Sequence, residues 1–355
     1  MRKLASVQKI EEVKDIPNAD RIQAYRVQGW WVVDQKDKYQ VGDKVIYCEV
    51  DSWIPHELAP FLSKGQEPKE YNGVKGNRLR TIKLKGQLSQ GLILPISLKP
   101  LDNPINTEFS FIGHDLGSDV SSILGIQKWE APIPAQLQGV TKGNFPSFIK
   151  KTDQERAQNL WDWIEEEGIL DVPVEITTKL DGSSITVYCN KGEVGVCSRN
   201  LDLKLDQEGN TFVDTAMKSG ILDKLKQIHH NTARSLAIQA ELMGEGIQKN
   251  REGLKGHDFF IYDIWDIDRQ CYLGHAERMV SLRMIDPEYS YYHVPVLYSN
   301  QTLRDIGVET LDDLLKLAEG PSLNNPVREG IVIKAMGGSF SFKAISNKFL
   351  MKNGD

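Results

Sequence analysis

Residues 171–190 read DVPVEITTKLDGSSITVYCN, and the KLDG at positions 179–182 separates two segments in which apolar and polar residues alternate. Alternation with a period of two is typical of half-buried strands, so VEITTKL and SSITVYC predict two strands. An Asp-Gly pair between such strands favours a tight β-hairpin turn. The same lysine would also suit the attack on a phosphate, and the rest of the chain must decide between these interpretations.

The chain has the length and composition of an ordinary globular protein with two domains. It contains 355 residues, of which 40% are hydrophobic and 26% are charged, and this length is comfortable for two domains. No stretch resembles a signal peptide or approaches the roughly 20 apolar residues of a membrane span. The scattered Cys48, Cys189, Cys197 and Cys271 favour reduced thiols over a disulfide framework or a zinc site. We therefore expect a cytoplasmic protein without a membrane partner.

Positive charge is concentrated in one short run near the amino terminus. The formal net charge of −6 divides into +3 for residues 1–150 and −9 for the remainder. Within the first part, KGNRLRTIKLKG contains no acid. A solvated strand face is one interpretation of this run. The other is a strip that follows nucleic-acid phosphates through Arg78, Arg80, Lys83 and Lys85.

The order of predicted elements indicates two domains of different class. Residues 1–135 read as short strands broken by turns, which favours a small all-β barrel. Residues 136–150 lie in a stretch rich in Gly, Pro and Ser and are predicted to be a linker. Residues 151–355 combine strands with helices predicted over 152–166 and 211–230, which is an α+β pattern.

KLDG is a weak signal by itself, because a K-x-D-G string arises by accident in roughly one chain in ten to twenty of this length. Four further motifs follow it in order: SRN at 198–200, AELMGEG at 240–246, FFIYDIW at 259–265, and REGIVIK at 328–334, which is followed by FSFKAISNKF. As a set these motifs resemble the covalent nucleotidyltransferases, the superfamily of ATP-dependent ligases and capping enzymes.

The amino-terminal run from EEVKDIPNAD to VGDKVIY resembles OB-fold nucleic-acid-binding domains of the tRNA-binding type. An OB-like domain followed by a nucleotidyltransferase domain is similar to the order in the Deinococcus-type RNA ligases. The resemblance implies an amino-terminal all-β OB-like barrel. It also implies a carboxy-terminal α+β nucleotidyltransferase domain, ATP-grasp-like, with antiparallel sheets.

Lys179 fits the role of the nucleophile. A lysine can attack the α-phosphorus of ATP only as a free amine, so its pKa must fall from about 10.4 towards neutrality. Gly182 lets the backbone approach a nucleotide. Asp181 points to the same side of an extended strand as Lys179, which suits it to hold a metal's water or a ribose hydroxyl. The alternative, a surface lysine beside a hairpin turn, is disfavoured by the set of motifs.

Phosphoryl chemistry at this lysine requires a divalent cation, Mg²⁺ or Mn²⁺, because charge develops on the α-phosphate and on the departing pyrophosphate. The resemblance implies that Glu241 and Glu329, together with Asp181, hold the metal or its water. Each of the two glutamates lies beside an apolar strand, where a merely structural acid usually demands an ion partner. A structural role is the alternative for both.

The resemblance also implies further contacts to the nucleotide. Lys334 and Lys343 are expected to face phosphate, with solvated surface lysines as the alternative. Tyr262 is expected to stack on the purine, because an aromatic ring supplies a flat apolar surface, with a core aromatic as the alternative. Arg199 is expected to meet the nucleotide and the 3′-OH end, since arginine suits bidentate phosphate contact. Ser184 either faces phosphate or is a plain turn hydroxyl.

The sequence departs from a common ligase pattern near Lys343. Position 341 is serine and position 345 is isoleucine, so a second lysine two residues away is missing. Which residue replaces it stays open.

These patterns predict an ATP-dependent RNA ligase that seals 3′-OH and 5′-phosphate ends. A lysyl-AMP intermediate and an adenylylated 5′-phosphate end would connect the steps. We expect the substrate to be an RNA duplex with a nick or break, and the protein to act as a monomer. Two alternatives stay open: a DNA ligase or capping-type enzyme of the same superfamily, and a non-catalytic RNA-binding protein on a ligase scaffold.

Overall fold

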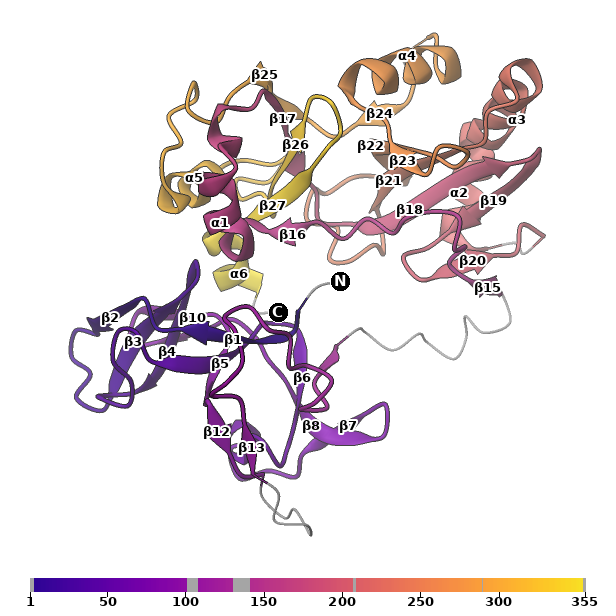
Figure 1. Cartoon of the computed structure of the whole chain (residues 1–355). Coiled ribbons are helices and arrows are strands. Elements are labelled where there is room, and N and C mark those ends of the chain that lie inside the picture. The colour runs from indigo at the N-terminus through magenta and orange to yellow at the C-terminus, as the bar shows by residue number, and fades with distance from the viewer. Residues whose placement is uncertain (1–2, 101–107, 130–140, 207–208, 289, 354–355) are drawn as a thin grey trace. The chain divides into compact units, whose positions relative to one another are not determined.

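The computed structural model describes residues 3–100, 108–129, 141–206, 209–288 and 290–353, which form two compact units (Figure 1). The first unit holds the described residues up to 129 together with 158–162 and 350–353, and the second holds the remaining ones. Of the linker predicted at 136–150, residues 136–140 lie outside the described part, and residues from 141 on belong to the second unit. The domain boundaries themselves stay a prediction.

The described residues 3–100 and 108–129 form short strands and one 3-10 helix, Pro60–Ser63. The strands are β1 (Ala5–Lys9), β2 (Glu12–Asp15), β3 (Ile22–Val27), β4 (Trp30–Gln35), β5 (Lys44–Cys48), β6 (Ser52–Pro55), β7 (Lys69–Tyr71), β8 (Val74–Arg78), β9 (Ile82–Leu84), β10 (Gln87–Ser89), β11 (Leu92–Pro95), β12 (Ser97–Leu98), β13 (Phe109–Ser110) and β14 (Gln127–Lys128). The larger sheets have the orders β1-β5-β11, β2-β3-β4 and β14-β6-β8-β7. The all-β class predicted for this part is confirmed.

The second unit contains two sheets in which most neighbouring strands are antiparallel. The larger sheet has the order β15-β20-β19-β18-β21-β22-β23, with β24 beside β22. Its strands are β15 (Thr141–Asn144), β18 (Ser183–Asn190), β19 (Glu193–Cys197), β20 (Leu201–Leu203), β21 (Leu236–Gly244), β22 (His257–Asp266), β23 (Cys271–Tyr272) and β24 (Tyr292–His293).

The smaller sheet of this unit has the order β16-β27-β26-β17-β25. Its strands are β16 (Glu155–Arg156), β17 (Val174–Lys179), β25 (Val296–Gln301), β26 (Gly330–Ala335) and β27 (Ser341–Ile345). With its helices, the unit has the predicted α+β class with antiparallel sheets.

The KLDG turn joins these two sheets and does not close a hairpin. β17 pairs with β25 and β26 in the smaller sheet, whereas β18 pairs with β19 and β21 in the larger one. The hairpin interpretation is therefore wrong, because the strands on either side of Asp181-Gly182 take partners far along the chain. Lys179, the last residue of β17, lies where the chain crosses from one sheet to the other.

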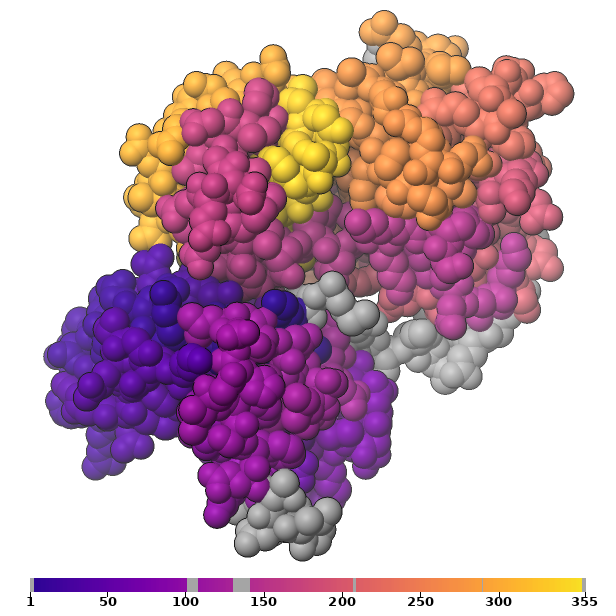
Figure 2. All heavy atoms as spheres, viewed as in Figure 1, coloured from indigo at the N-terminus to yellow at the C-terminus, as the bar shows by residue number. Residues whose placement is uncertain are grey.

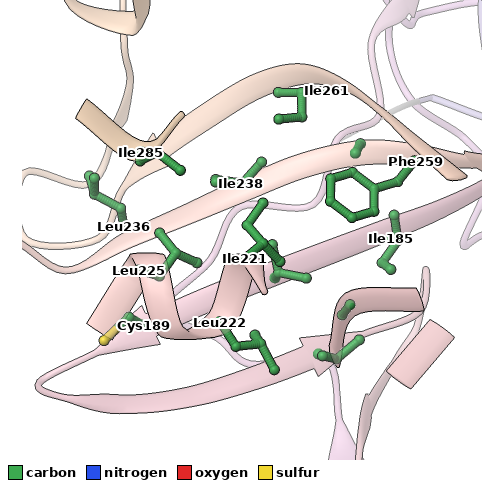
Figure 3. Packing of buried hydrophobic residues seen from close by; sticks show 14 of the residues in the cluster. Ile185, Cys189, Ile221, Leu222, Leu225, Leu236, Ile238, Phe259, Ile261 and Ile285 are labelled. Atoms are coloured by element: carbon green, nitrogen blue, oxygen red, sulfur yellow. The ribbon is translucent and has the colours of Figure 1, made fainter. Parts of the chain in front are cut away.

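Three helices cover one face of the larger sheet (Figure 1). They are α2 (Thr211–Ser219), α3 (Ile221–Thr232) and α4 (His275–Ile285). Figure 3 shows Ile221 and Leu225 of α3 packed with Ile185 of β18 and Ile238 of β21. Because side chains alternate across a strand, the neighbouring residues of β18 and β21 point to the opposite face of the sheet.

Two predicted helices differ from the structure. The helix predicted over 211–230 is divided at Gly220, whose φ of 70° ends α2, a conformation that glycine adopts without steric cost. The helix predicted over 152–166 begins only at Ala157, because Glu155–Arg156 pairs in parallel with β27. Figure 2 shows the yellow C-terminal strands next to the magenta segment around β16. The remaining helices are a 3-10 turn (Ile169–Asp171), α1 (Ala157–Glu166), α5 (Leu311–Leu317) and α6 (Asn347–Asn353).

The cysteines are all free thiols, as predicted, and Cys48, Cys189 and Cys197 are buried. Among the helices described here, none has the length and apolar character needed to cross a membrane.

Gly195 of β19 offers a test of the packing in the larger sheet. A Cβ at this position would lie 2.3 Å from the ring of Tyr188, whose hydroxyl is held by Asp202 at 3.0 Å. We expect Gly195→Ala to lower the free energy of unfolding of the second unit by about 1–3 kcal/mol through overpacking. Gly143→Ala is the matched control, since a Cβ there meets nothing within 4 Å. Equal unfolding temperatures of Gly195→Ala and Gly143→Ala in calorimetry would contradict this account.

Candidate active site

Strand register places the three predicted catalytic lysines on one face of the smaller sheet. Lys179 is paired with Gly330, and Lys334 of β26 is paired with Glu175, four residues before Lys179 on β17. Lys343 of β27 is paired with the β26 residue that faces Thr177. At about 3.3 Å per residue, Lys343 lies roughly 7 Å and Lys334 roughly 13 Å along the strands from the level of Lys179. The three lysines therefore lie at successive levels along the strands and do not form one cluster.

The open face of the larger sheet carries the residues predicted from the next motifs. Ser184 of β18 is paired with Glu241 of β21, and Glu241 is paired with Phe260 of β22. The register between β21 and β22 shifts at Tyr262, which is the extra residue of a β-bulge. Bulges turn a side chain out of the regular alternation and often occur beside active sites. Tyr262 is thereby set on the strand next to Glu241.

Lys179 is held in an ion pair at the end of β17. Its Nζ donates to Glu329 Oε2 at 2.6 Å, and 26% of the lysine side chain is exposed, which leaves it accessible to a ligand. Burial by itself lowers the pKa of Lys179, but the charges of Glu329, Glu241 and Asp181 outweigh burial and raise it. The expectation that the pKa of this lysine falls is therefore not met by the protein without ligands, because three carboxylates surround the ammonium group.

Glu241 is a second carboxylate close enough to Lys179 to affect its charge. Its Oε1 accepts the backbone N–H of Gly182 at 3.0 Å. Burial, together with the nearby Glu329, raises the pKa of Glu241 to about 7 against the lowering effect of Lys179. Only glycine fits at position 182, because a Cβ would lie 2.4 Å from the carbonyl oxygen of Leu242 and 2.9 Å from Glu241 Cγ.

The donor set around Lys179 fits a hard divalent cation. Asp181, Glu241 and Glu329 bring three carboxylates to one ammonium group, and Arg251 lies 3.7 Å from Asp181. Within the described residues, no group of three His, Cys, Asp or Glu side chains is close enough to hold a metal alone. Mg²⁺ commonly takes one or two carboxylates, with waters and substrate phosphates as the other ligands. The residues present therefore suit a metal that arrives with a nucleotide.

Lys334 lies beside the predicted stacking residue and not beside Lys179. Its Nζ donates to the carbonyl oxygen of Tyr262 at 2.5 Å, is 2.9 Å from Asp263 Oδ2, and is 5.7 Å from the centre of the Tyr262 ring. Burial lowers the pKa of Lys334 against the opposing charge of Asp263. The Tyr262 hydroxyl is fixed by Thr152 Oγ1 at 3.4 Å.

A buried charge network behind Lys334 was missed by the sequence analysis. Glu175 accepts hydrogen bonds from Arg278 and, at 2.8 Å, from His275, and Arg278 is also 3.7 Å from Asp263. Burial alone would raise the pKa of Glu175, but Arg278 and Lys334 lower it. A charged residue inside the apolar strand VEITTK was the available signal. Its partners come from other strands and from α4, so the sequence could not identify them.

The remaining predicted residues lie on both sheets, with Arg199 just after a strand of the larger sheet and Lys343 in the middle of β27 of the smaller one. Arg199 is exposed in the turn after β19, at the end of β19 that faces the start of β18 and Ser184. Lys343 is 3.8 Å from Asp153. Arg156 is paired with Lys343 and is only 8% exposed. The pattern at 152–166 predicts a helix through Arg156, so it did not predict this pairing with Lys343.

The predicted nucleic-acid residues differ in their surroundings. Arg78 is tied to Asp51 by two hydrogen bonds, of 2.7 and 3.1 Å, and stacks at 3.9 Å on Trp129. Arg80, Lys83 and Lys85 are exposed on or beside the β9–β10 hairpin. Lys85 and Gly86 both have positive φ, 49° and 89°, as a tight two-residue turn requires. The hairpin residues are therefore available to a ligand, whereas Arg78 is engaged within the unit.

The raised pKa of Glu241 gives a testable pH dependence. Between pH 4.5 and about 7 the folded protein keeps a proton at Glu241 that the unfolded chain has released. The contribution of this group to stability therefore decreases as the pH rises through that interval. In EDTA, Glu241→Gln should unfold at a higher temperature than the wild type at pH 8, and the difference should shrink towards pH 5. A difference independent of pH would refute this assignment.

A family model described as RNA ligase matches residues 172–345, and an OB-fold domain model matches residues 4–96. Curated proteins gave no match. An apo mutant of Naegleria gruberi RNA ligase is 41% identical, with a TM-score of 0.86, and the match covers 100% of this chain and 99% of that one.

Two further structures of the Naegleria gruberi RNA ligase are similar to the same extent. One is described as a complex with PPi and the other as a mutant with ATP and Mn; both are 41% identical, with TM-scores of 0.85 and 100% of both chains covered. The likeness extends over both units and confirms the OB domain followed by a nucleotidyltransferase-type domain. By sequence identity and by fold, the chain belongs to the RNA ligase family.

Proposed function

We propose that this RNA ligase seals 3′-OH and 5′-phosphate ends with ATP, through a lysyl-AMP intermediate on Lys179. The observation that carries the proposal is the position of Lys179 among Glu329, Glu241 and Asp181, at the crossing between two sheets. The amine of Lys179 is ion-paired with Glu329, and its side chain is still partly exposed to a ligand. The Naegleria ligase structures with ATP and Mn support ATP and a divalent cation as the cofactors.

In the first step, Lys179 Nζ forms a bond to the α-phosphorus of ATP while the bond to the bridging oxygen breaks and pyrophosphate leaves. Nζ must first lose a proton, and Glu329 Oε2, at 2.6 Å, is the acceptor already in contact. A divalent cation bound by the carboxylates would supply positive charge that offsets their effect on the pKa of Lys179. The same positive charge would stabilise the negative charge that develops on the phosphates. In the second step, AMP passes from Lys179 to the 5′-phosphate of the RNA. In the third, the 3′-OH attacks that phosphate and AMP is released.

The row of lysines suggests how the nucleotide lies. We place the α-phosphate at Lys179 and the purine against Tyr262, since the bulge on β22 presents this ring. Lys334 contacts Tyr262, so we assign it to the base end of the nucleotide rather than to the phosphates. Lys343, roughly 7 Å along from Lys179, is better placed for phosphate, with Arg199 and Ser184 near the strand ends.

The first unit is proposed to hold the RNA, a duplex with a nick or break, through the exposed hairpin residues Arg80, Lys83 and Lys85. Phosphate contacts of this kind are electrostatic and carry little sequence information. Arg78, tied to Asp51 and Trp129, would shape this surface. We further propose that the protein works as a monomer in the cytoplasm, in keeping with free thiols and with both units lying in one chain.

The lysyl-AMP intermediate can be tested by incubating the protein with α-labelled ATP or GTP and a divalent cation, followed by denaturing electrophoresis. We expect label from ATP that is discharged by pyrophosphate and absent in Lys179→Ala, because only an amine at position 179 can form the phosphoramidate. Label that persists in Lys179→Ala would place the nucleophile elsewhere. Label from GTP alone would favour a capping-type enzyme.

The role of the basic hairpin can be tested through salt. Replacing Arg80, Lys83 and Lys85 together by alanine should weaken RNA binding at low salt and reduce the slope of log K against log salt by about one per lost phosphate contact. ATP labelling should be unchanged, since these residues belong to the first unit. Binding and a salt slope equal to those of the wild type would exclude the hairpin as the RNA grip.

A further inference from the structure

The loop between β21 and β22, residues 245–256, connects the strand of Glu241 with the strand of Tyr262. It contacts the turn after Lys179 at two points. Gln248 Nε2 donates to the carbonyl oxygen of Gly182 at 3.2 Å, and Arg251 Nη1 lies 3.7 Å from Asp181 Oδ2. Both contacts reach the turn that carries the nucleophile. We call residues 245–256 the strap.

The strap is anchored to the segment that leads to Glu329. Glu252, which is only 7% exposed, accepts the backbone N–H groups of Asn324 at 2.6 Å and Asn325 at 3.1 Å. The Asn325 side chain donates in return to the carbonyl oxygen of Arg251 at 3.1 Å. These bonds fix the strap backbone at Arg251 and Glu252.

The Arg251 side chain is fixed as well. Its guanidinium carbon is 4.5 Å from the ring centre of Phe349, at the start of α6, and only 12% of the side chain is exposed. Within the described residues, Nη1 has no hydrogen-bond partner, and its distance from Asp181 is too long for one. A buried N–H without an acceptor costs free energy. A small shift of Asp181 towards Arg251 would remove that cost.

We infer that Arg251 is a positioning residue that orients the Asp181 carboxylate for the reaction of Lys179. The inference rests on the proposed function of Lys179. Phe349 fixes the plane of the Arg251 guanidinium group, and the strap fixes the backbone of Arg251. Asp181 is the acidic group that this guanidinium group faces. Because Arg251 is enclosed by these partners, it acts on the reaction through Asp181 and does not contact the nucleotide.

The test is a single-turnover measurement of lysyl-AMP formation over a range of ATP concentrations. The variants are Arg251→Met, Arg251→Lys and Asp181→Asn, together with the double variant Arg251→Met/Asp181→Asn. Lys249→Ala is the matched control, because Lys249 is an exposed residue of the same strap. Phe349→Leu, which removes the ring and keeps the arginine, stands in if Arg251→Met does not fold.

We expect Arg251→Met to slow the step at saturating ATP by about 10–100-fold, as is typical for residues that orient a catalytic ligand. The ATP concentration at half-maximal rate should stay within about twofold of the wild-type value, since substrate binding is not altered. Arg251→Lys should recover part of the rate, because it keeps the charge but loses the planar fork. In the Asp181→Asn background, adding Arg251→Met should slow the step by less than about a further threefold.

An equal loss from Arg251→Met with and without Asp181 would overturn the inference, because Arg251 would then act without Asp181. A raised half-maximal ATP concentration with an unchanged rate would overturn it too, and would make Arg251 a nucleotide contact. Labelling of the wild type in the same assay distinguishes failure of the proposed function from failure of the role inferred for Arg251. Without wild-type lysyl-AMP the proposed function fails, whereas wild-type labelling with unimpaired Arg251→Met and Phe349→Leu refutes only the role of Arg251.

Discussion

The interaction on which the site depends is the ion pair between Lys179 and Glu329, inside a group of carboxylates that one lysine cannot neutralise. These carboxylates raise the pKa of Lys179, whereas burial, together with the nearby Glu329, raises the pKa of Glu241. Without ligands, the proposed nucleophile Lys179 is therefore held in its ammonium form, which cannot attack phosphorus. A bound divalent cation with its nucleotide would reverse the balance, which couples the reactivity of the lysine to the arrival of its cofactors.

The fold serves this charge cluster by joining two sheets at one short turn. β17 brings Lys179, β21 brings Glu241, and the residue before β26 is Glu329. At Gly182 the turn passes so close to β21 that any larger residue would collide with Leu242 and Glu241. Next to Glu329, the buried Arg328 donates to carbonyl oxygens at the end of α5, so the loop that delivers this glutamate is tied to a helix.

The other end of the site is arranged by a different set of charges. Glu175, Arg278, Asp263 and Lys334 form a buried network in which each charge has an opposite partner. Breaking such a network by removing one member leaves an uncompensated charge, which is far more costly than never having had the pair. This network holds Lys334 against Tyr262 and so separates the base end of the proposed nucleotide site from the reacting end.

The sequence by itself determined the two domain classes, the family and the identity of the candidate residues, because strand periodicity and motif order are local properties of the chain. It failed where the partner of a residue lies far along the chain. KLDG looked like a hairpin turn, yet its flanking strands pair in different sheets. The predicted helix at 152–166 lost its first turn to β16, which required β27 as a partner. The raised pKa of Lys179, the place of Lys334 beside Tyr262, and the strap at Arg251 were decided only by tertiary structure, because each depends on charges and contacts that converge from separate strands.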